Sequence, residues 1–524
     1  MKSKCILCAA IALSVMTISC QGKGEDGGGK SGGNESSDVR TLTISPDRTT
    51  ILKNPLNGWV MYVSASSDPS YFDTKIYVPE LGKEVLVRDY ASACYIRTGW
   101  KAFNPSDGKY VWDDPSARLT QLINRAEELG IPIAFRVVVD GRDQRENTPQ
   151  FVFDAGAKYW LSDSKFPDRK TPLAVDPVWR QYYEKFVIAF AARFNDPSKC
   201  AFIDAYGLGK WGEGHNVCYE QDNAVSSRTA EYKANTMEWI TGLYSREFTR
   251  VPLVINYHRH IGHPVSEGAK AESDSETVLQ IALDNGYCLR SDAFGMNNNS
   301  WGYNNWERTY VSKWNFKVPV IMEGGWIVGQ HSYWNDEKGY RKDHPEDVRK
   351  GEFDASAEAH VNMMDFRVGD ETKSWFETSF NLVQRFATEG GYRVYPDKVT
   401  LPMSLKQGTA AKITHRWRNL GWGYLPNNIK QWNYKYKVAF ALLAADGSVA
   451  QLFIDEKCEP SEWIQGTPME YTLDVKAAVK TGTYLWAVAI VDTTLESTPA
   501  IDLAIAKLSK TENGWTSLAN VNVE

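Results

Sequence analysis

The chain has 524 residues, a length that predicts two or three domains. Hydrophobic residues make up 43% and charged residues 24% of the chain, which are ordinary values for folded proteins and exclude a chain that is disordered throughout. Its one long apolar run lies near the N-terminus, which excludes a protein with several membrane spans. The formal net charge of −6 argues against a nucleic-acid partner held on a basic surface.

The N-terminus has the features of an export signal. Two lysines precede an apolar stretch, Ile6 to Ile18, which is too short to span a bilayer but suits the core of a signal peptide. The stretch leads to Cys20, and a small residue followed by cysteine resembles the processing site of a bacterial lipoprotein, in which that cysteine is lipidated. We expect a lipoprotein signal in residues 1–20, a flexible Gly-rich tether in residues 21–40, and a lipid anchor as the only membrane contact. The location would be the periplasmic or surface face of the cell envelope; an ordinary cleaved signal is the alternative.

From residue 41 to residue 395, short apolar runs alternate with amphipathic helical stretches. This is the pattern of parallel βαβ units, and eight such strands predict a (β/α)₈ barrel with several long loops. The strands are expected at residues 58–62, 94–100, 131–140, 202–208, 252–258, 292–297, 318–322 and 360–366. The main helices are expected at residues 117–129, 177–194, 229–245, 275–285, 305–314 and 373–388.

Beyond residue 395 the pattern changes to short strands separated by turn residues, with no long helix. About 130 residues of this kind predict a β-sandwich over residues 396–524. Its strands are expected at residues 398–405, 411–419, 436–443, 450–453, 469–475, 482–491 and 501–508. We expect this domain to support the barrel rather than to bind a ligand of its own.

Two glutamates stand where a barrel places its reactive side chains, at the C-terminal ends of strands. Glu213 follows the fourth strand in a Gly-rich turn, and Glu323 directly follows the apolar run of the seventh. Such a pair suits cleavage of a glycosidic bond, because one carboxyl protonates the leaving oxygen while the other attacks or steadies the anomeric carbon. The alternatives are structural: Glu213 would pair with Lys210 or Arg136, and Glu323 with Arg97.

Other side chains at or near strand ends are candidates for substrate binding. The chain has 19 Trp residues, and flat rings near such a site would stack on a sugar, although core packing is the alternative for each ring. The candidates are Arg97, Trp100, Asp140, Trp211, His215, Asn256, His258, Asn297 and Trp326.

The His-rich segment His258, His260 and His263, with His215 nearby, could form a metal site. Barrel metal hydrolases carry a His-x-His pair on the first strand, and the first strand here has no histidine. We therefore expect no metal and no cofactor.

Three early segments carry a resemblance to a known family: Tyr95–Trp100, Phe103–Trp112 and Ala126–Ile133. They resemble the first strands of retaining glycoside hydrolases of clan A, particularly the β-galactosidase-like members, and the resemblance extends over residues 55 to about 395. In that clan the acid/base glutamate follows strand four and the nucleophile follows strand seven. The resemblance therefore implies that Glu213 is the acid/base and Glu323 the nucleophile.

The chain departs from this clan at one position. The clan has Asn immediately before the acid/base, where it contacts the sugar 2-hydroxyl, and this chain has Gly212. The contact must come from elsewhere, with Asn216 and Asn256 as candidates, or the substrate differs at that carbon. The chain also resembles a group of exported bacterial lipoproteins that share a Gly-x-Trp-Gly-Glu turn, the stretch 389–393 and a C-terminal β-domain.

Together these features predict an exported glycoside hydrolase. It would cleave an oligo- or polysaccharide, a plant or host glycan, by a retaining double displacement. The alternative from another class is a non-catalytic glycan-binding lipoprotein on a barrel scaffold, which the glycine at position 212 favours. A lyase or transglycosylase is a third alternative.

Overall fold

The structure is a computed structural model that describes residues 39–140, 146–161, 168–219, 230–262, 269–294, 303–326, 328 and 345–524. The chain divides into residues 1–38 and one compact unit of residues 39–524. The predicted signal peptide, Cys20 and all but the end of the predicted tether lie outside the described residues. Within the described ranges, no helix combines the length and apolar character that crossing a membrane requires.

Eight parallel strands close into a barrel, as the sequence predicts. Each strand pairs with the next, and the eighth pairs with the first, so the described strands of the barrel leave no open edge. The strands are β2 (Gly58–Ser64), β5 (Ala91–Gly99), β6 (Ile133–Val138), β9 (Cys200–Asp204), β10 (Leu253–Asn256), β11 (Tyr287–Phe294), β12 (Val320–Gly324) and β13 (Met363–Asp365).

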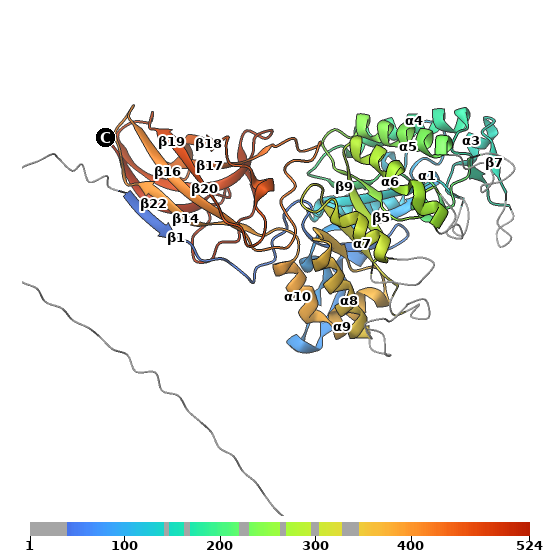
Figure 1. Cartoon of the computed structure of the whole chain (residues 1–524), viewed down its shortest axis with the longest axis horizontal. Coiled ribbons are helices and arrows are strands. Elements are labelled where there is room, and N and C mark those ends of the chain that lie inside the picture. The colour runs from blue at the N-terminus through green and yellow to red at the C-terminus, as the bar shows by residue number, and fades with distance from the viewer. Residues whose placement is uncertain are drawn as a thin grey trace, which may run out of the picture. The chain divides into compact units, whose positions relative to one another are not determined.

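Helices follow most of these strands, and α4, α5 and α6 lie along the outside of the barrel (Figure 1). The long helix α4 begins as expected at Pro177, because the Asp176 side chain accepts the backbone N–H of Trp179 and caps it. The helices are α1 (Trp100–Phe103), α2 (Arg118–Glu128), α3 (Gln150–Asp154), α4 (Pro177–Phe194), α5 (Ala230–Glu247), α6 (Ala269–Asp284), α7 (Asn305–Ser312), α8 (Pro345–Glu358), α9 (Asp370–Thr378) and α10 (Phe380–Glu389). Two small two-stranded sheets lie in the loops of the barrel. They consist of β3 (Lys75–Val78) with β4 (Lys83–Leu86), and of β7 (Tyr159–Trp160) with β8 (Thr171–Pro172).

Several barrel elements differ from the prediction. The helix predicted over residues 275–285 begins six residues earlier, at Ala269, and helix α8 was not predicted. The sixth strand begins at Tyr287, five residues before the predicted start, so the side chains that it points inward were not recognised from the sequence. The helix predicted over residues 373–388 is two helices, α9 and α10, which meet at Ser379, where the backbone is not helical.

The C-terminal region consists of two sheets that share a hydrophobic core, as predicted for a sandwich. The first sheet has the order β1 (Val39–Thr43), β14 (Val394–Pro402), β16 (Ala410–Asn419) and β19 (Met469–Lys476). The second has the order β15 (Ser404–Leu405), β22 (Thr516–Val523), β20 (Gly482–Asp492), β17 (Tyr436–Leu443) and β18 (Val449–Asp455), with β21 (Thr498–Ile501) on β20.

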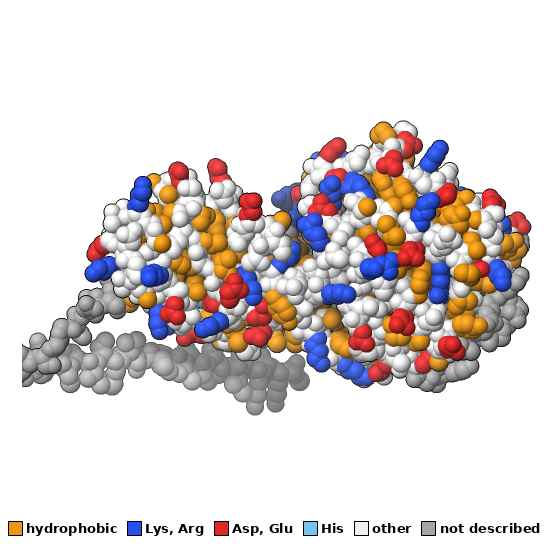
Figure 2. Space-filling model, turned by 90° about the horizontal axis from the view of Figure 1, so that it is seen from above, with side chains coloured by type: hydrophobic (Ala, Val, Ile, Leu, Met, Phe, Trp, Pro, Cys, Tyr) orange, Lys and Arg blue, Asp and Glu red, His pale blue; other side chains and the backbone are white. Residues whose placement is uncertain are grey.

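Two strands of this region were not predicted. β1 pairs antiparallel with β14, so residues 39–43, which were assigned to the tether and the start of the barrel, belong to the C-terminal sheet. The last strand, β22, was also missed, and the strand predicted at 501–508 ends at Ile501. On the face seen in Figure 2, Lys and Arg side chains are interspersed with Asp and Glu, so this face carries no basic stripe.

The barrel interior changes from apolar to charged along the strands. Side chains point inward at every second residue of a strand, so each strand contributes a ladder of inward positions. One apolar layer contains Val60, Ala93, Ala134, Phe202, Val254, Cys288, Ile321 and Met363, which share one buried cluster. Two residues further along, several of the same strands carry Arg136, Asp204, Asn256, Arg290, Glu323 and Asp365, all buried. A charged layer therefore lies at the C-terminal ends of the strands.

Candidate active site

The loop after β9 brings Glu213 onto the charged layer. A short 3-10 helix, Lys210–Gly212, ends at Glu213. A side chain on Gly207 would place its Cβ 2.3 Å from the backbone oxygen of Val137, so only glycine lets the loop pass so close to β6. Gly212 has a φ of +79°, and a Cβ there would lie 3.2 Å from Arg136 Cδ. An asparagine at position 212 would therefore adopt a strained backbone conformation and would require the Arg136 side chain to shift.

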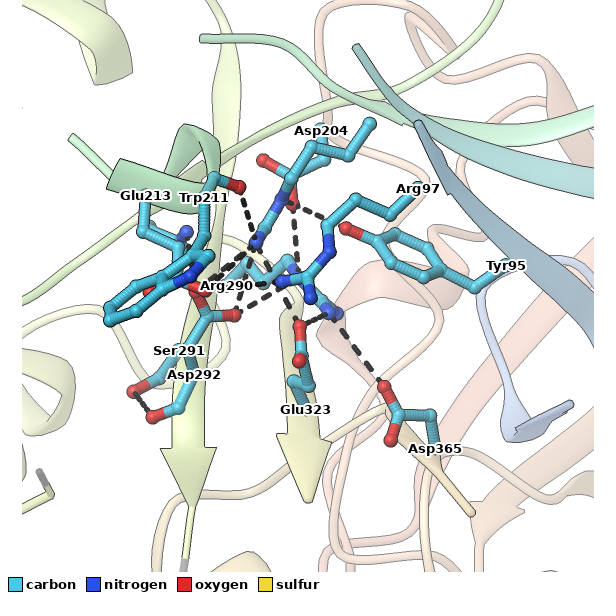
Figure 3. A network of polar contacts seen from close by, with 12 residues as sticks. Tyr95, Arg97, Asp204, Trp211, Glu213, Arg290, Ser291, Asp292, Glu323 and Asp365 are labelled. Carbon is cyan, nitrogen blue, oxygen red and sulfur yellow. Dashed lines mark hydrogen bonds and ion pairs between the residues drawn. The ribbon is translucent and has the colours of Figure 1, made fainter. Parts of the chain in front are cut away.

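Glu213 lies among three partners at the mouth of the barrel. Its Oε1 is 3.2 Å from Arg136 Nη1 and 3.4 Å from Arg97 Nη1, and its Oε2 is 3.3 Å from His215 Nε2. The side chain is 15% exposed, so solvent or a ligand can reach it. Figure 3 shows Glu213 beside Trp211, whose half-buried ring lies 5.3 Å from the His215 ring.

Glu323 lies deeper in the same cluster. Its side chain is only 2% exposed and forms ion pairs with Arg290 and Arg367. Its Oε2 is also 3.8 Å from Arg136 Nη2. The two predicted glutamates therefore contact the two terminal nitrogens of one guanidinium, although 110 residues separate them in the chain. The alternative partner predicted for Glu323, Arg97, pairs with Glu213 instead.

Sequence reasoning missed several members of this cluster. Asp204, Arg290, Asp292 and Arg367 were not among the candidates, although each contacts another charged member. The sequence did contain a signal for β11. Cys288, Arg290 and Asp292 occupy every second position, so all three point inward once the strand is taken to begin at Tyr287. We call the whole set the charged cluster: Arg97, Arg136, Asp204, Glu213, Arg290, Asp292, Glu323, Asp365 and Arg367.

The charges in this cluster shift the pKa values of their neighbours. Burial acts to raise the pKa of Asp292, but the positive charges of Arg136 and Arg290 outweigh it and lower that pKa below its ordinary value. Burial raises the pKa of Asp365 to about 6, against the opposing effect of Arg290. Asp292 is therefore held as an anion more firmly than Asp365.

Two predicted polar residues from and just after β10 support the cluster. Asn256 donates from Nδ2 to Asp292 Oδ2 at 2.8 Å. His258 donates from Nε2 to the backbone oxygen of Glu213 at 2.6 Å and accepts the backbone N–H of His260 at Nδ1 at 3.1 Å. Burial, followed by the neighbouring His215, lowers the pKa of His258 to about 3, so this ring is neutral near pH 7. Both of its nitrogens are engaged, which leaves neither as a metal ligand.

Trp100 and Asp140, which were both predicted to bind substrate, are buried in the structure. Trp100 is fully buried and packs against Tyr183 and Phe186 in the core, because α1 turns its ring away from the barrel mouth. Asp140 is 2% exposed and accepts the Thr171 hydroxyl at 3.0 Å.

Trp326 remains a candidate, with Arg367 4.5 Å from its ring centre. Asn297 and His263 lie outside the described residues, so the structure does not place either of them.

A second titratable cluster lies in the C-terminal sheets. His415, Asp455 and Cys458 are buried with ligand atoms close enough for one ion. However, His415 Nδ1 accepts the Trp417 indole N–H at 2.8 Å, and its Nε2 donates to Asp455 at 3.0 Å. Burial also raises the pKa of the Cys458 thiol well above its usual value. These hydrogen bonds and the protonated thiol fit a packed core, not a metal centre.

A buried pair of glutamates fixes the backbone that follows β12. Gly325 donates its N–H to Glu352 Oε1 at 2.7 Å, and Val328 donates to Glu371 Oε1 at 3.0 Å. Arg349 bridges the two glutamates, with both contacts at 2.7 Å. The loop that carries Trp326 is therefore held by helices α8 and α9.

This arrangement predicts a pH dependence of stability. Burial raises the pKa of Glu352 to about 7, whereas an unfolded glutamate titrates near its ordinary value of about 4.3. The stabilising contribution is therefore complete below about pH 4.3 and is lost as the pH rises to about 7, by about 4 kcal/mol at most. Glu352→Gln should flatten this part of the dependence of unfolding free energy on pH, while Glu358→Gln on the exposed face of α8 should not. A Glu352→Gln protein with the wild-type slope would contradict the assignment.

Comparisons with known proteins locate similar folds but no family. No protein-family model matches the chain, and no curated protein matches it. Among solved structures, the endo-β-1,4-mannanase from Thermotoga petrophila aligns at 10% identity and TM-score 0.37, covering 90% of this chain and 98% of that one. A GH5-4 broad-specificity endoglucanase from an uncultured bacterium aligns at 12% identity and TM-score 0.37, covering 66% of this chain and 96% of that one. The catalytic domain of a β-amylase from Paenibacillus polymyxa aligns at 9% identity and TM-score 0.36, covering 56% of this chain and 90% of that one. At these scores the likeness does not define what this chain acts on.

Proposed function

We propose that the protein is a retaining glycoside hydrolase, with Glu213 as acid/base and Glu323 as nucleophile. The observation that carries the proposal is that these two glutamates, one in the loop after the fourth barrel strand and one on the seventh, contact one guanidinium, that of Arg136, at the C-terminal ends of the strands. Paired carboxyl groups at such a position are the machinery that glycosidic cleavage needs.

The two carboxyl groups differ in the way that the reaction requires. In the first step, Glu213 gives its proton to the glycosidic oxygen, the bond from that oxygen to the anomeric carbon breaks, and a Glu323 oxygen bonds to that carbon. In the second step, Glu213 takes a proton from water, the water oxygen bonds to the carbon, and Glu323 leaves as a carboxylate. Glu323 is held ionised for attack by Arg290 and Arg367, and Glu213 is the more exposed of the two.

The rings of Trp211 and Trp326 support a sugar as the substrate. Both are partly exposed and lie beside members of the charged cluster, where they could stack on the apolar face of a pyranose. The proposed substrate is an oligo- or polysaccharide of plant or host origin, and a β-galactosidase-like specificity is the finer part of the proposal. We further propose that the enzyme is exported and anchored to the cell envelope by a lipid on Cys20.

A non-catalytic glycan-binding protein is the second candidate. It is favoured by the burial of Glu323, which is 2% exposed and paired with two arginines. Both candidates would bind oligosaccharides, so calorimetry does not separate them. Release of a reducing sugar separates them, and NMR of the first product reports whether its anomeric configuration is retained.

The Glu213→Gln variant tests the acid role. We expect turnover to fall by about 10²–10⁴-fold on glycosides with poor leaving groups, because the leaving oxygen no longer receives a proton. The loss should be much smaller with dinitrophenyl glycosides, whose leaving group departs without a proton. Rates are measured on a panel of aryl glycosides and glycan fragments, and Glu128→Gln on the exposed face of α2 is the control.

An equal loss of rate with good and poor leaving groups would contradict the assignment of Glu213 as the acid. Full activity of Glu213→Gln on every substrate that the wild-type protein cleaves would remove this residue from the mechanism altogether.

A further inference from the structure

Arg97 is the most exposed arginine of the charged cluster. Its side chain is 18% exposed, whereas the side chains of Arg136 and Arg290 are at most 1% exposed. The side chain of Arg367 lies between these limits, at 5%. Arg97 belongs to the last turn of the β5 ladder, two positions after the inward residue Tyr95. A ligand that enters the barrel mouth therefore reaches Arg97 before the deeper arginines.

The arginines of the cluster also differ in how fully they are paired. The two deeper arginines each form ion pairs with four carboxylates of the cluster. Among the described residues, Arg97 pairs with Glu213 alone, through Nη1 at 3.4 Å. In the same part of the chain, Arg367 pairs with Glu323 alone. A guanidinium has five N–H donors, so both arginines keep donors that these carboxylates do not use.

Glu213 does not depend on Arg97 for a charged partner. Its Oε1 lies closer to Arg136 Nη1, at 3.2 Å, and its Oε2 lies 3.3 Å from His215 Nε2. Arg97 can therefore turn to a ligand while Glu213 keeps its other contacts.

Arg97 and Arg367 lie beside the same aromatic ring. Their guanidinium carbons are 6.0 and 5.4 Å from the centre of the Tyr62 ring. Tyr62 comes from β2, which pairs with β5 on one side and with β13 on the other. Arg367 is also 4.5 Å from the centre of the partly exposed Trp326 ring. We call this part of the rim the basic arc: Arg97 and Arg367 with the rings of Tyr62 and Trp326.

The exposed carboxylate Asp292 lies across the mouth from Arg97. β5 and β11 are four strands apart in either direction around the closed barrel, so they face each other. Asp292 is 13% exposed, and Arg136 and Arg290 both pair with it. The negative charge on that side is therefore matched within the protein, whereas the basic arc has donors to spare. An anionic group of a ligand would be drawn to the basic arc.

The chemistry of the basic arc selects among sugars. The hydroxyl groups of a neutral sugar supply no charge to match an arginine. A carboxylate or a sulfate ester presents two or more oxygens that fit the planar fork of a guanidinium and form charge-assisted hydrogen bonds with it. The Trp326 ring beside this fork offers an apolar surface to the sugar ring itself.

We propose that the substrate contains an acidic sugar, a uronic acid or a sulfated sugar, whose anionic group binds Arg97 while Arg367 adds its charge. The inference rests on the proposed function and deepens it by naming the charge class of the substrate. An acidic sugar of galacto configuration also fits the finer part of that proposal.

Binding of monosaccharides tests the inference without any cleavage, because a free monosaccharide has no glycosidic bond. Calorimetry compares galacturonate, glucuronate and mannuronate with galactose, glucose and mannose, from which they differ only at carbon 6. The 6-sulfates of the same three sugars form a second series. At low salt we expect an acid to bind at least about 10-fold more tightly than its neutral counterpart, and salt should reduce this preference. The series with the larger preference shows whether the anion is a carboxylate or a sulfate. Acids of both series that bind no better than neutral sugars overturn the proposal.

The Arg97→Gln variant tests the assigned residue. Glutamine keeps a polar side chain but has no charge, so the preference for the acid should fall close to one. Arg97→Lys keeps the charge without the fork and should retain part of the preference. A residue that only held Glu213 would weaken binding of acidic and neutral sugars alike, and an unchanged preference in Arg97→Gln excludes Arg97 as the partner of the anion. Arg118→Gln is the matched control, because Arg118 forms an exposed ion pair with Asp68.

Cleavage of aryl glycosides separates failure of this inference from failure of the proposed function. If the protein binds the acids preferentially but cleaves neither nitrophenyl uronides nor nitrophenyl glycosides of neutral and sulfated sugars, the acidic-sugar site stands and the hydrolase proposal fails. If it cleaves the neutral glycosides and shows no preference for acids in binding or in kcat/KM, the hydrolase proposal stands and this inference fails.

Discussion

Glu323→Gln is expected to lower turnover by roughly 10⁴–10⁶-fold, the scale on which loss of a covalent nucleophile acts in other enzymes. Glutamine is nearly the same size, but its amide cannot attack the anomeric carbon. The loss should be similar for good and poor leaving groups, in contrast to Glu213→Gln. Single-turnover kinetics with an activated aryl glycoside should show no burst of product from the variant.

The experiment needs a check that the Glu323→Gln protein is still folded. Glu323 is buried between Arg290 and Arg367, so removing its charge leaves two guanidinium groups less well paired. Far-UV circular dichroism and the melting temperature are therefore measured beside the rates. Glu323→Ala leaves room for azide, and azide should restore cleavage and give a glycosyl azide of inverted configuration. A folded Glu323→Gln protein with wild-type turnover would exclude Glu323 as the nucleophile.

Arg136→Met is expected to have the largest effect on stability. Arg136 is fully buried and contacts four carboxylates: Asp204 at 2.6 Å, Glu213 at 3.2 Å, Asp292 at 3.0 Å and Glu323 at 3.8 Å. Methionine fills much of the same space but leaves these carboxylates facing one another. We expect the free energy of unfolding to fall by about 3–5 kcal/mol, as happens when one partner of a buried ion pair is removed.

Denaturant unfolding followed by tryptophan fluorescence measures this loss. Arg118→Met is the matched control, because Arg118 forms an exposed ion pair with Asp68 and its loss should change the unfolding free energy by about 1 kcal/mol or less. Lowering the pH should narrow the difference in unfolding free energy between Arg136→Met and the wild-type protein, because protonated carboxyl groups no longer repel one another. Equal effects of the two substitutions would show that the charged cluster is not held together by Arg136.

The sequence by itself determined the barrel and the C-terminal sheets. Periodic apolar runs mark strands and helices locally, so seven of the eight barrel strands and helix α4 lie close to where they were predicted. The same patterns located Glu323, because a strand that ends in a carboxylate stands out against its apolar run, and Glu213 stood out in the Gly-rich turn that follows the fourth strand. These features depend on a few neighbouring residues, and each can be recognised without knowledge of the rest of the chain.

Only the tertiary structure decided which side chains meet. Whether Asp292 points into the barrel depends on where β11 begins. The strand was predicted to begin at residue 292 rather than at Tyr287, so Arg290 and Asp292 were not recognised as neighbouring inward residues. Trp100 follows a strand end, as a binding residue would, yet α1 turns it into the core. Carboxylates from four strands, β9, β11, β12 and β13, converge on Arg136 and Arg290 because a closed barrel brings all its strand ends to one rim. Contact across such a rim joins residues that are far apart in the chain, and local patterns carry no signal of it.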